Sequence, residues 1–148
     1  MSPDLWEQLY SPDKNLYQKG GKMLKDKYQN LIKFGEEIGL KEEYVKEDGG
    51  KLKIKGTVEY QIEKDRYWNK IKESAEWKEE VSADIRVEKD DIYGKYEVKS
   101  GDTLGKIAKE FYGDPMKYKD IFAMNTDILT NPDLIKVGQV LKMPKKYT

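Results

Sequence analysis

Carboxylates that could perform acid–base chemistry are frequent in this sequence, and they occur as neighbouring pairs. Four pairs stand among lysines: Glu36–Glu37, Glu42–Glu43, Glu79–Glu80 and Asp90–Asp91. General acid–base catalysis needs two carboxyl groups on opposite sides of one substrate, in a pocket that separates their pKa values. Adjacent pairs on lysine-rich polar faces do not provide that arrangement, so we interpret them as solvated surface.

The residue types that are missing restrict the chemistry further. The 148 residues include no histidine and no cysteine, which excludes Ser-His-Asp and Cys-His nucleophilic sites, ordinary zinc sites and disulfides. The EDGG segment at 47–50 lacks the alternating oxygen ligands and the terminal acid of an EF-hand, and it indicates a hairpin turn instead. We therefore expect no enzyme and no cofactor, with a K⁺ ion as the one exception considered below.

Charge and hydropathy indicate the expected surroundings of the chain. Its 28 basic and 28 acidic residues balance, so neither nucleic acid nor an anionic membrane is an expected partner. The N-terminal stretch lacks the features of a secretory signal, and no apolar run approaches the ~18 residues of a membrane span. These patterns predict a soluble protein of the bacterial cytoplasm.

In the last third of the chain, residues 96–145, the spacing of the apolar residues changes from that of a strand to that of a helix. The predicted strand and helix position the candidate site. Tyr96 and Val98 alternate as in a strand, and Asp102 or Thr103 then caps a predicted helix. Three- and four-residue spacing gives that helix an apolar face: Leu104, Ile107, Ala108 and Phe111.

A second helix and a closing strand are predicted after Gly113. Asp114 is the candidate N-cap and Pro115 suits the first helical position. The expected buried residues of the helix are Tyr118, Ile121 and Phe122, and a turn-rich passage then leads into a strand with Val140, Leu141 and Met143. Asn125 is the predicted left-handed terminator of the helix.

This order, strand–helix–helix–strand, carries the motifs VKSGDTL, AKEFYGD and NPDLIKVGQVL. Together they resemble the LysM domain. The resemblance implies a non-catalytic βααβ fold that holds a glycan containing N-acetylglucosamine in a shallow groove. The groove residues implied here are Gly101, Asp102, Thr103 and Leu104 on one side, and Asp127, Ile128, Leu129 and Ile135 on the other.

Residues 25–90 predict a second α/β unit. A helix with Tyr28 and Leu31 on its apolar face precedes a hairpin that turns at Gly49–Gly50, and Gly56 marks a bulge or a close backbone approach. A helix over about 63–75 and a strand with Val81, Ala83, Ile85 and Val87 complete the unit. Its pattern, V-x4-G-x-L-x-I-x-G-x-V, resembles the BON domain.

The remaining segments are an N-terminal helical arm, residues 1–24, and a linker, residues 91–95. Trp6, Leu9 and Tyr10 indicate an arm that either covers a gap between the two units or offers a surface to a protein partner. We expect the tryptophans to pack in a core or an interface, and Trp77 is the one most open to a binding role. Because units of this size bury little apolar surface alone, we expect the two to dock. The fold class is α+β, with a BON-like sandwich and a C-terminal LysM domain.

A BON-like domain followed by one LysM domain resembles the bacterial cytoplasmic LysM/BON potassium-binding proteins. The resemblance implies reversible K⁺ binding through backbone carbonyls, which leave no side-chain signature. Two alternatives stay open: a peptidoglycan-binding protein that recognises N-acetylglucosamine, and a structural adaptor of a phage-tail-like contractile injection machine.

Overall fold

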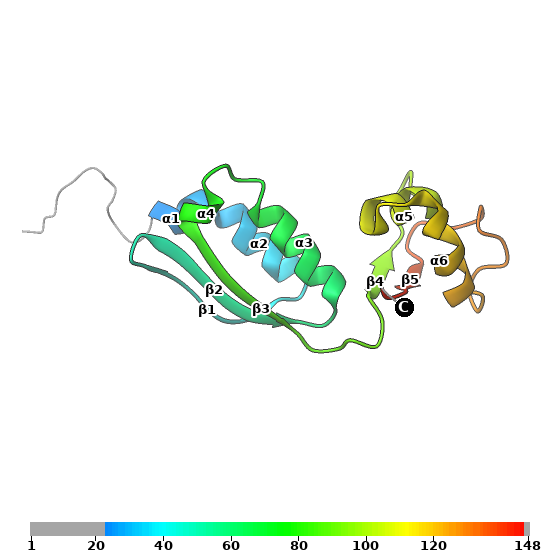
Figure 1. The fold of residues 1–148 in the computed structure, drawn as a ribbon, viewed down its shortest axis with the longest axis horizontal. Coiled ribbons are helices and arrows are strands. Elements are labelled where there is room, and N and C mark those ends of the chain that lie inside the picture. The colour runs from blue at the N-terminus through cyan, green and yellow to red at the C-terminus, as the bar shows by residue number, and fades with distance from the viewer. Residues whose placement is uncertain (1–22, 147–148) are drawn as a thin grey trace, which may run out of the picture. The chain divides into compact units, whose positions relative to one another are not determined.

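The computed structural model describes residues 23–146 (Figure 1). Two compact units make up this part of the chain. Residues 23–59 and 63–88 form the N-terminal unit, and residues 60–62 and 89–146 form the C-terminal unit. The predicted interaction residues of the arm, Trp6, Leu9 and Tyr10, lie outside the described residues.

The N-terminal unit is a three-stranded sheet with helices on one face (Figure 1). Its elements are α1 (Met23–Lys27), α2 (Gln29–Glu37), β1 (Lys41–Asp48), β2 (Lys51–Val58), α3 (Gln61–Ile71), α4 (Trp77–Glu80) and β3 (Val81–Val87). The sheet order is β1-β2-β3, antiparallel between β1 and β2 and parallel between β2 and β3. The predicted order of helix, hairpin, helix and strand is confirmed, with α4 as an additional short helix.

Glycines allow the tight turn and the close strand pairing of the β1–β2 hairpin, as the sequence predicts. Gly49 and Gly50 have φ values of +62° and +80°, a backbone conformation that other residues adopt only with strain. A Cβ on Gly56 would lie 2.7 Å from the carbonyl oxygen of Lys41, and the register of β1 shifts between Glu42 and Tyr44, opposite this glycine. The predicted close approach at Gly56 is thus confirmed.

The core of the N-terminal unit lies between the helices and the sheet. Its buried residues are Tyr28, Leu31, Leu40, Leu52, Ile54, Val58, Tyr67, Ile71, Val81 and Ile85. Alternate residues of β2 are buried, which matches the predicted period of two. Every second side chain of this strand therefore packs on the helices.

The segment after α3 differs from its prediction. The helix ends at Ile71, four residues before the predicted end, and Ala75 is exposed rather than inward. Trp77 begins α4 and packs edge-to-face on Trp68, with 5.7 Å between ring centroids. Half-buried against the core, Trp77 is part of the packing and does not stand free in a polar loop.

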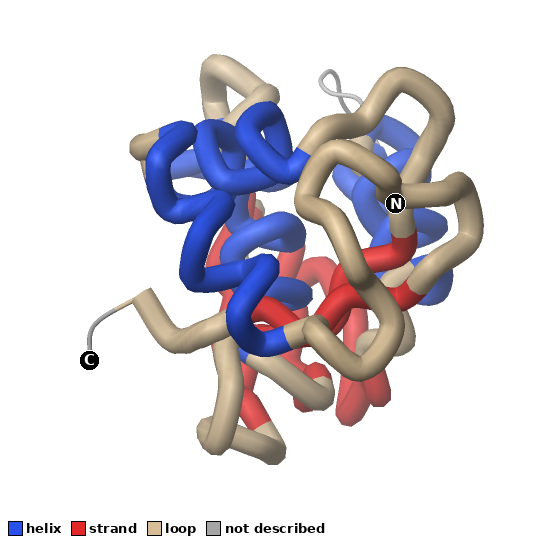
Figure 2. Tube along the Cα trace, turned by 90° about the vertical axis from the view of Figure 1, so that its right-hand side faces the viewer, coloured by secondary structure: helices blue, strands red, loops and turns tan. Residues whose placement is uncertain are grey.

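The C-terminal unit has the predicted βααβ order. β4 (Gly94–Glu97) pairs antiparallel with β5 (Val140–Met143), and between them stand α5 (Leu104–Tyr112), the 3₁₀ helix η1 (Pro115–Lys117) and α6 (Tyr118–Met124). The loop from residue 125 to 139, which joins α6 to β5, is drawn in tan in Figure 2. The residues buried in α5 are the four predicted ones: Leu104, Ile107, Ala108 and Phe111.

Two cap predictions are refined and one is wrong. Thr103, not Asp102, caps α5, because its side chain accepts a hydrogen bond from the Lys106 N–H. Asp114 caps the turn that Pro115 begins, as predicted, although that turn is 3₁₀ rather than α. Asn125 does not adopt a left-handed conformation: its φ is −123°. Its side chain is buried and bonds to α6 and β5 instead.

β4 begins two residues before Tyr96, inside the segment expected to be a linker. The Tyr93 ring is buried in the core of the C-terminal unit, and its N–H donates to the Met143 carbonyl over 2.9 Å. Tyr93 also accepts a backbone hydrogen bond from Ile62, which belongs to the same unit. Backbone pairing and burial thus extend the C-terminal unit towards the N-terminus.

Candidate binding surfaces

The first predicted groove segment, residues 101–104, is a capped turn. Gly101 is exposed with φ +85°, and Asp102 accepts hydrogen bonds of 2.7 Å from the Tyr96 hydroxyl and the Lys99 N–H. Thr103 is exposed and caps α5, whereas the Leu104 side chain is buried. Gly101 and Thr103 are therefore the accessible members of this segment, and Asp102 fixes its shape.

The second predicted segment also contains both exposed and buried residues. Asp127 is exposed and Ile128 keeps 43% of its surface, but Leu129 is 2% exposed. Ile135 is half-buried and packs against the core. Leu104 and Leu129 thus form part of the core under the loops, while the other residues predicted for the groove retain accessible surface.

Sequence reasoning missed three exposed apolar residues on and after the long loop. Leu134, Val137 and Val140 retain 63%, 67% and 51% of their surface. In a turn-rich loop no periodicity distinguishes the buried apolar positions from the exposed ones. Gly138, with φ +92°, is the turn that brings the chain into β5.

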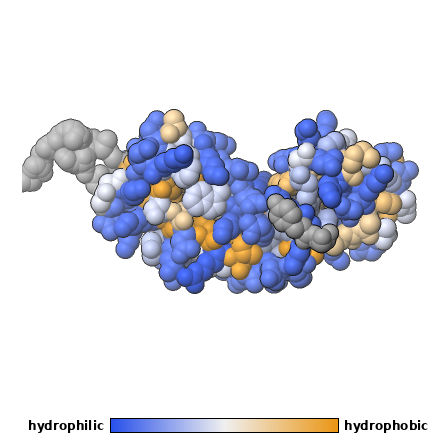
Figure 3. All heavy atoms as spheres, viewed as in Figure 1, coloured by the Kyte–Doolittle hydropathy of each residue, from blue (hydrophilic) through white to orange (hydrophobic). Residues whose placement is uncertain are grey.

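Exposed apolar side chains are concentrated in the C-terminal unit. Among the described residues, the large exposed apolar side chains are Tyr44, Met116, Met124, Ile128, Leu134, Val137 and Val140, and all except Tyr44 belong to this unit. Apolar surface is visible over both units in Figure 3. Scattered single apolar residues need no explanation, whereas a contiguous apolar patch is typical of a binding surface.

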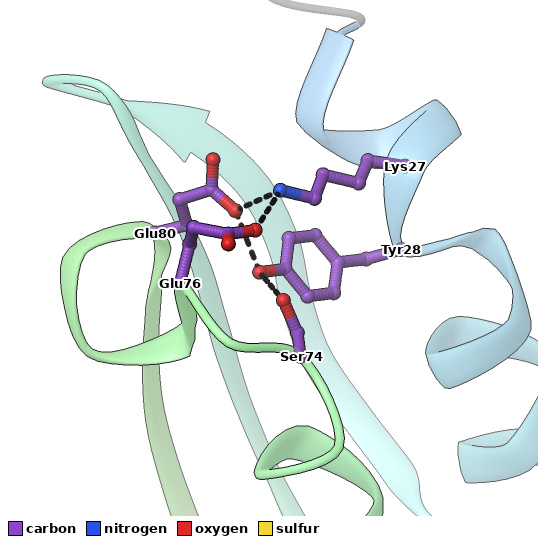
Figure 4. A network of polar contacts seen from close by, with 5 residues as sticks. All are labelled: Lys27, Tyr28, Ser74, Glu76 and Glu80. Atoms are coloured by element: carbon purple, nitrogen blue, oxygen red, sulfur yellow. Dashed lines mark hydrogen bonds and ion pairs between the residues drawn. The ribbon is translucent and has the colours of Figure 1, made fainter.

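The N-terminal unit carries a polar network that joins α1 to the segment 74–80 (Figure 4). The Lys27 ammonium lies 2.8 Å from a Glu76 oxygen and 2.7 Å from a Glu80 oxygen. The Tyr28 hydroxyl donates to Glu80 over 2.7 Å and lies 3.0 Å from the Ser74 hydroxyl. We call these five residues the α1 clamp.

The α1 clamp combines a serine, a tyrosine and a lysine, which in another arrangement could support proton transfer. The hydrogen bonds that Lys27 donates to Glu76 and Glu80 raise the pKa of Lys27, and burial raises the pKa of Tyr28. A general base at neutral pH needs these pKa values lowered, not raised. Lys27 thus stays charged and Tyr28 neutral, and the clamp acts as a structural tie.

From residue 23 to 146, no three Asp or Glu side chains gather as they would around a metal ion. None of the helices that the structure describes has the length and apolar character to traverse a bilayer.

Comparison with known proteins decides the nature of the C-terminal unit. Residues 96–144 match the LysM domain family. Those residues are a LysM domain. This match confirms the resemblance found in the sequence and accounts for the βααβ order.

Two relatives share part of this chain. The potassium binding protein Kbp of Escherichia coli O6:H1 is 49% identical over 51 residues, which are 34% of this chain and 34% of Kbp. A Deinococcus radiodurans protein named only as uncharacterized is 53% identical over 49 residues, 33% of this chain and 19% of that protein. The chain thus spans about a third of the length of Kbp and about a fifth of the length of the Deinococcus radiodurans protein. The matched segments of 51 and 49 residues are about as long as one LysM domain.

Proposed function

We propose that this chain is a non-enzymatic K⁺-binding protein of the cytoplasm, in which a BON-like domain precedes the LysM domain. The observation that carries the proposal is the 49% identity to a protein whose name states potassium binding. Further support comes from the N-terminal unit, whose order of helix, hairpin, helix and strand is the one that the resemblance to BON implies.

K⁺ binding of this kind is physically reasonable without acidic side chains. K⁺ is a large, weakly hydrated cation, and several backbone carbonyl oxygens can replace its hydration shell, as they do in K⁺ channels. The proposal therefore assigns the ion to backbone oxygens and gives no role to the carboxylate pairs. The expected consequence of binding is that the ligand stabilises the folded chain and draws the two units together.

Thermal unfolding of the full chain in KCl, NaCl and choline chloride at equal ionic strength tests this proposal. A ligand that binds only the folded state stabilises it by about 2.7 kcal/mol at a hundred times its Kd. That corresponds to a rise of roughly 5 to 10 °C in Tm for a chain of this size. We expect this rise in KCl alone, together with a smaller radius of gyration by X-ray scattering. Equal Tm values in all three salts contradict K⁺ binding.

A second function, glycan binding, is favoured by the exposed Ile128 and Leu134 on the loop before β5. Apolar faces of sugar rings pack on such side chains, and the LysM resemblance implies N-acetylglucosamine as the sugar.

Titration of the full chain with chitotetraose, followed by amide NMR shifts, tests glycan binding. Ile128→Asp should abolish shifts at residues 101–103, while Met116→Asp, at an exposed site on η1, should leave these shifts unchanged. Indifference to both K⁺ and chitotetraose favours the adaptor alternative.

A further inference from the structure

The sheet of the N-terminal unit ends in two edge strands, β1 and β3, which differ in character. β1, KEEYVKED, carries six charged residues among its eight, and a bulge between Glu42 and Tyr44 interrupts its pairing. β3, VSADIRV, carries two charged residues and pairs with β2 in a regular register from Val81 to Val87. Charges and bulges are the usual means that keep an edge strand from pairing with another chain. β1 has both protections, whereas β3 has few charges and no bulge.

The outer edge of β3 presents a row of backbone N–H and C=O groups. At the end of the strand, the Glu88 N–H donates to the Val58 carbonyl of β2 over 2.9 Å. Residues that bond to the neighbouring strand alternate with residues whose backbone groups point away from it. Counting back from Glu88, the outward-pointing residues are Ala83, Ile85 and Val87. Within residues 23–146, these three form no hydrogen bond outside the β2–β3 ladder.

The side chains of β3 alternate between the two faces of the sheet. Ile85 is buried in the core, and Ala83 and Val87 are half-buried against the same core. Asp84 and Arg86 are exposed on the opposite face. In the part of the chain that the structure describes, neither charged side chain has an ion-pair or hydrogen-bond partner. A strand beside β3 would therefore meet apolar side chains on one face and two charges of opposite sign on the other.

The sequence of β3 is complementary to itself in an antiparallel pair of two such strands. When Ile85 lies opposite Ile85 of a second copy, Asp84 of each copy lies opposite Arg86 of the other. On the core face Ala83 lies opposite Val87, so a small side chain meets a larger one. The outward-pointing residues then form the hydrogen-bonded pairs of the new ladder. Asp84 and Arg86 fall at the non-hydrogen-bonded positions, where opposite side chains are closer.

The two charges also select the register of this pair. Side chains must stay on their own faces of the sheet, so the neighbouring registers are shifted by two residues. One of these registers places Asp84 opposite Asp84, and the other places Arg86 opposite Arg86. Like charges directly opposite each other destabilise a pair of strands. The charge pattern of β3 therefore favours the register that is centred on Ile85.

We propose that two copies of this chain associate through β3, in an antiparallel pair centred on Ile85 that joins their three-stranded sheets into one continuous sheet. The same strand serves on both sides of the interface, so the assembly closes at two copies. A single pair of strands forms a small interface, and we expect a dissociation constant on the order of tens of micromolar. This inference does not depend on K⁺ or glycan binding, because it concerns other residues and a protein partner.

Analytical ultracentrifugation of the full chain, from well below to well above that concentration, tests the inference. We expect the mass to rise from that of one 17.3 kDa chain to twice that value. Hydrogen exchange over the same range locates the interface, because the Ala83, Ile85 and Val87 amides gain partners in the dimer. Their exchange should slow as the concentration rises, while exchange in β1 stays constant. A single-chain mass throughout, or slowing in β1 instead of β3, overturns the inference.

Charge reversal at the two exposed positions tests the register. Asp84→Arg and Arg86→Asp each place like charges opposite each other, so each variant alone should associate about tenfold more weakly or worse. An equimolar mixture of the two variants again places opposite charges face to face and should recover the affinity of the wild type. Lys46→Glu, an exposed charge reversal on β1, is the control and should leave association unchanged. Wild-type association of either single variant, or no recovery in the mixture, refutes the assignment.

Discussion

Asn125 shows how much one side chain can contribute to a small domain. It is 1% exposed and the one buried polar side chain among residues 23–146 for which burial is described. Its amide donates to the carbonyls of Ile121 and Lys142, and its Oδ1 accepts from the Lys142 N–H over 2.8 Å. Three hydrogen bonds made by one side chain therefore join α6 to β5 and satisfy polar groups in or near the core.

Replacing Asn125 by alanine should lower the free energy of unfolding by about 3 kcal/mol. The reason is that three backbone groups lose their partner in or near the core, and leaving buried polar groups unsatisfied costs roughly 1 to 3 kcal/mol each in unfavourable cases. Urea unfolding monitored by circular dichroism measures the loss.

Asn131→Ala is the matched control for that substitution. The Asn131 side chain accepts one hydrogen bond, from the Asp133 N–H, at an exposed turn. Its loss should cost below about 1 kcal/mol, because water can replace it. Similar costs for the two variants would mean that Asn125 does not join α6 to β5.

At the scale of elements, β2 depends on Gly56. A Cβ at this position would lie 2.7 Å from the Lys41 carbonyl oxygen and 2.8 Å from Leu40 Cδ1. The first contact is with backbone, so β1 would have to move away from β2. The bulge between Glu42 and Tyr44 lies opposite this glycine, so the shape of β1 and the missing side chain in β2 belong together.

Gly56→Ala should therefore destabilise the N-terminal unit by about 1 to 3 kcal/mol, the usual cost of overpacking. Gly105→Ala provides the opposite case, because a Cβ there meets nothing closer than 3.9 Å and the residue lies inside α5. That change should stabilise the chain by about 0.5 to 1 kcal/mol. Thermal unfolding of both variants decides the point, and a stabilising Gly56→Ala contradicts the close approach.

Because of the α1 clamp, the attachment of α1 depends on pH, but only in strongly acidic and strongly basic solution. The hydrogen bond from Lys27 lowers the pKa of Glu76 below its ordinary 4.5, so the contribution of this pair is present above that pH and is lost as the pH falls through the lowered value. The pKa of Lys27 is raised above 10.5, so the same contribution is present below 10.5 and is lost only at higher pH.

Lys27→Met should accordingly accelerate hydrogen exchange of the Tyr28 amide, which bonds to the Leu24 carbonyl. We expect about threefold lower protection at pH 6.5, in line with exposed ion pairs, and a smaller difference between variant and wild type as the pH falls through the lowered pKa of Glu76. Lys41→Met removes the exposed Lys41–Glu88 pair and should leave the Tyr28 amide unchanged. Equal protection in wild type and Lys27→Met at pH 6.5 argues against the clamp.

At the scale of the whole molecule, composition controls the response to pH. The 28 basic and 28 acidic residues balance, and no histidine or cysteine is present. Histidine is the side chain whose ordinary pKa lies between pH 5 and 8, so no side chain of the usual kind titrates there. The net charge therefore stays close to zero over a wide range around neutrality.

The free energy of unfolding should for this reason be nearly constant between pH 6 and 9. In that range we expect no group except the terminal amine to take up or release a proton on unfolding. We expect Tm to vary by less than about 2 °C over this range and to fall below pH 5 as the carboxylates are protonated. A series of thermal unfolding curves measures this. A marked maximum near pH 7 would point to a side chain with a strongly shifted pKa.

Sequence alone determined the features that depend on local patterns. Apolar periodicity located the buried face of α5 and the alternation of β2, and glycine chemistry located the turn at Gly49–Gly50. The order of both units followed from these signals, as did the LysM domain at residues 96–144. Each of these features is set by neighbours within a few residues, so the sequence carries it directly.

Only the tertiary structure decided how polar and loop residues are used. Asn125 is a plausible helix terminator by type, yet packing between α6 and β5 buries it. Trp77 follows a polar stretch, yet Trp68 packs against it. The α1 clamp and the hydrogen bond from the Tyr112 hydroxyl to the Pro144 carbonyl likewise join residues far apart in the chain. Such contacts depend on distances in space, which local spacing does not encode.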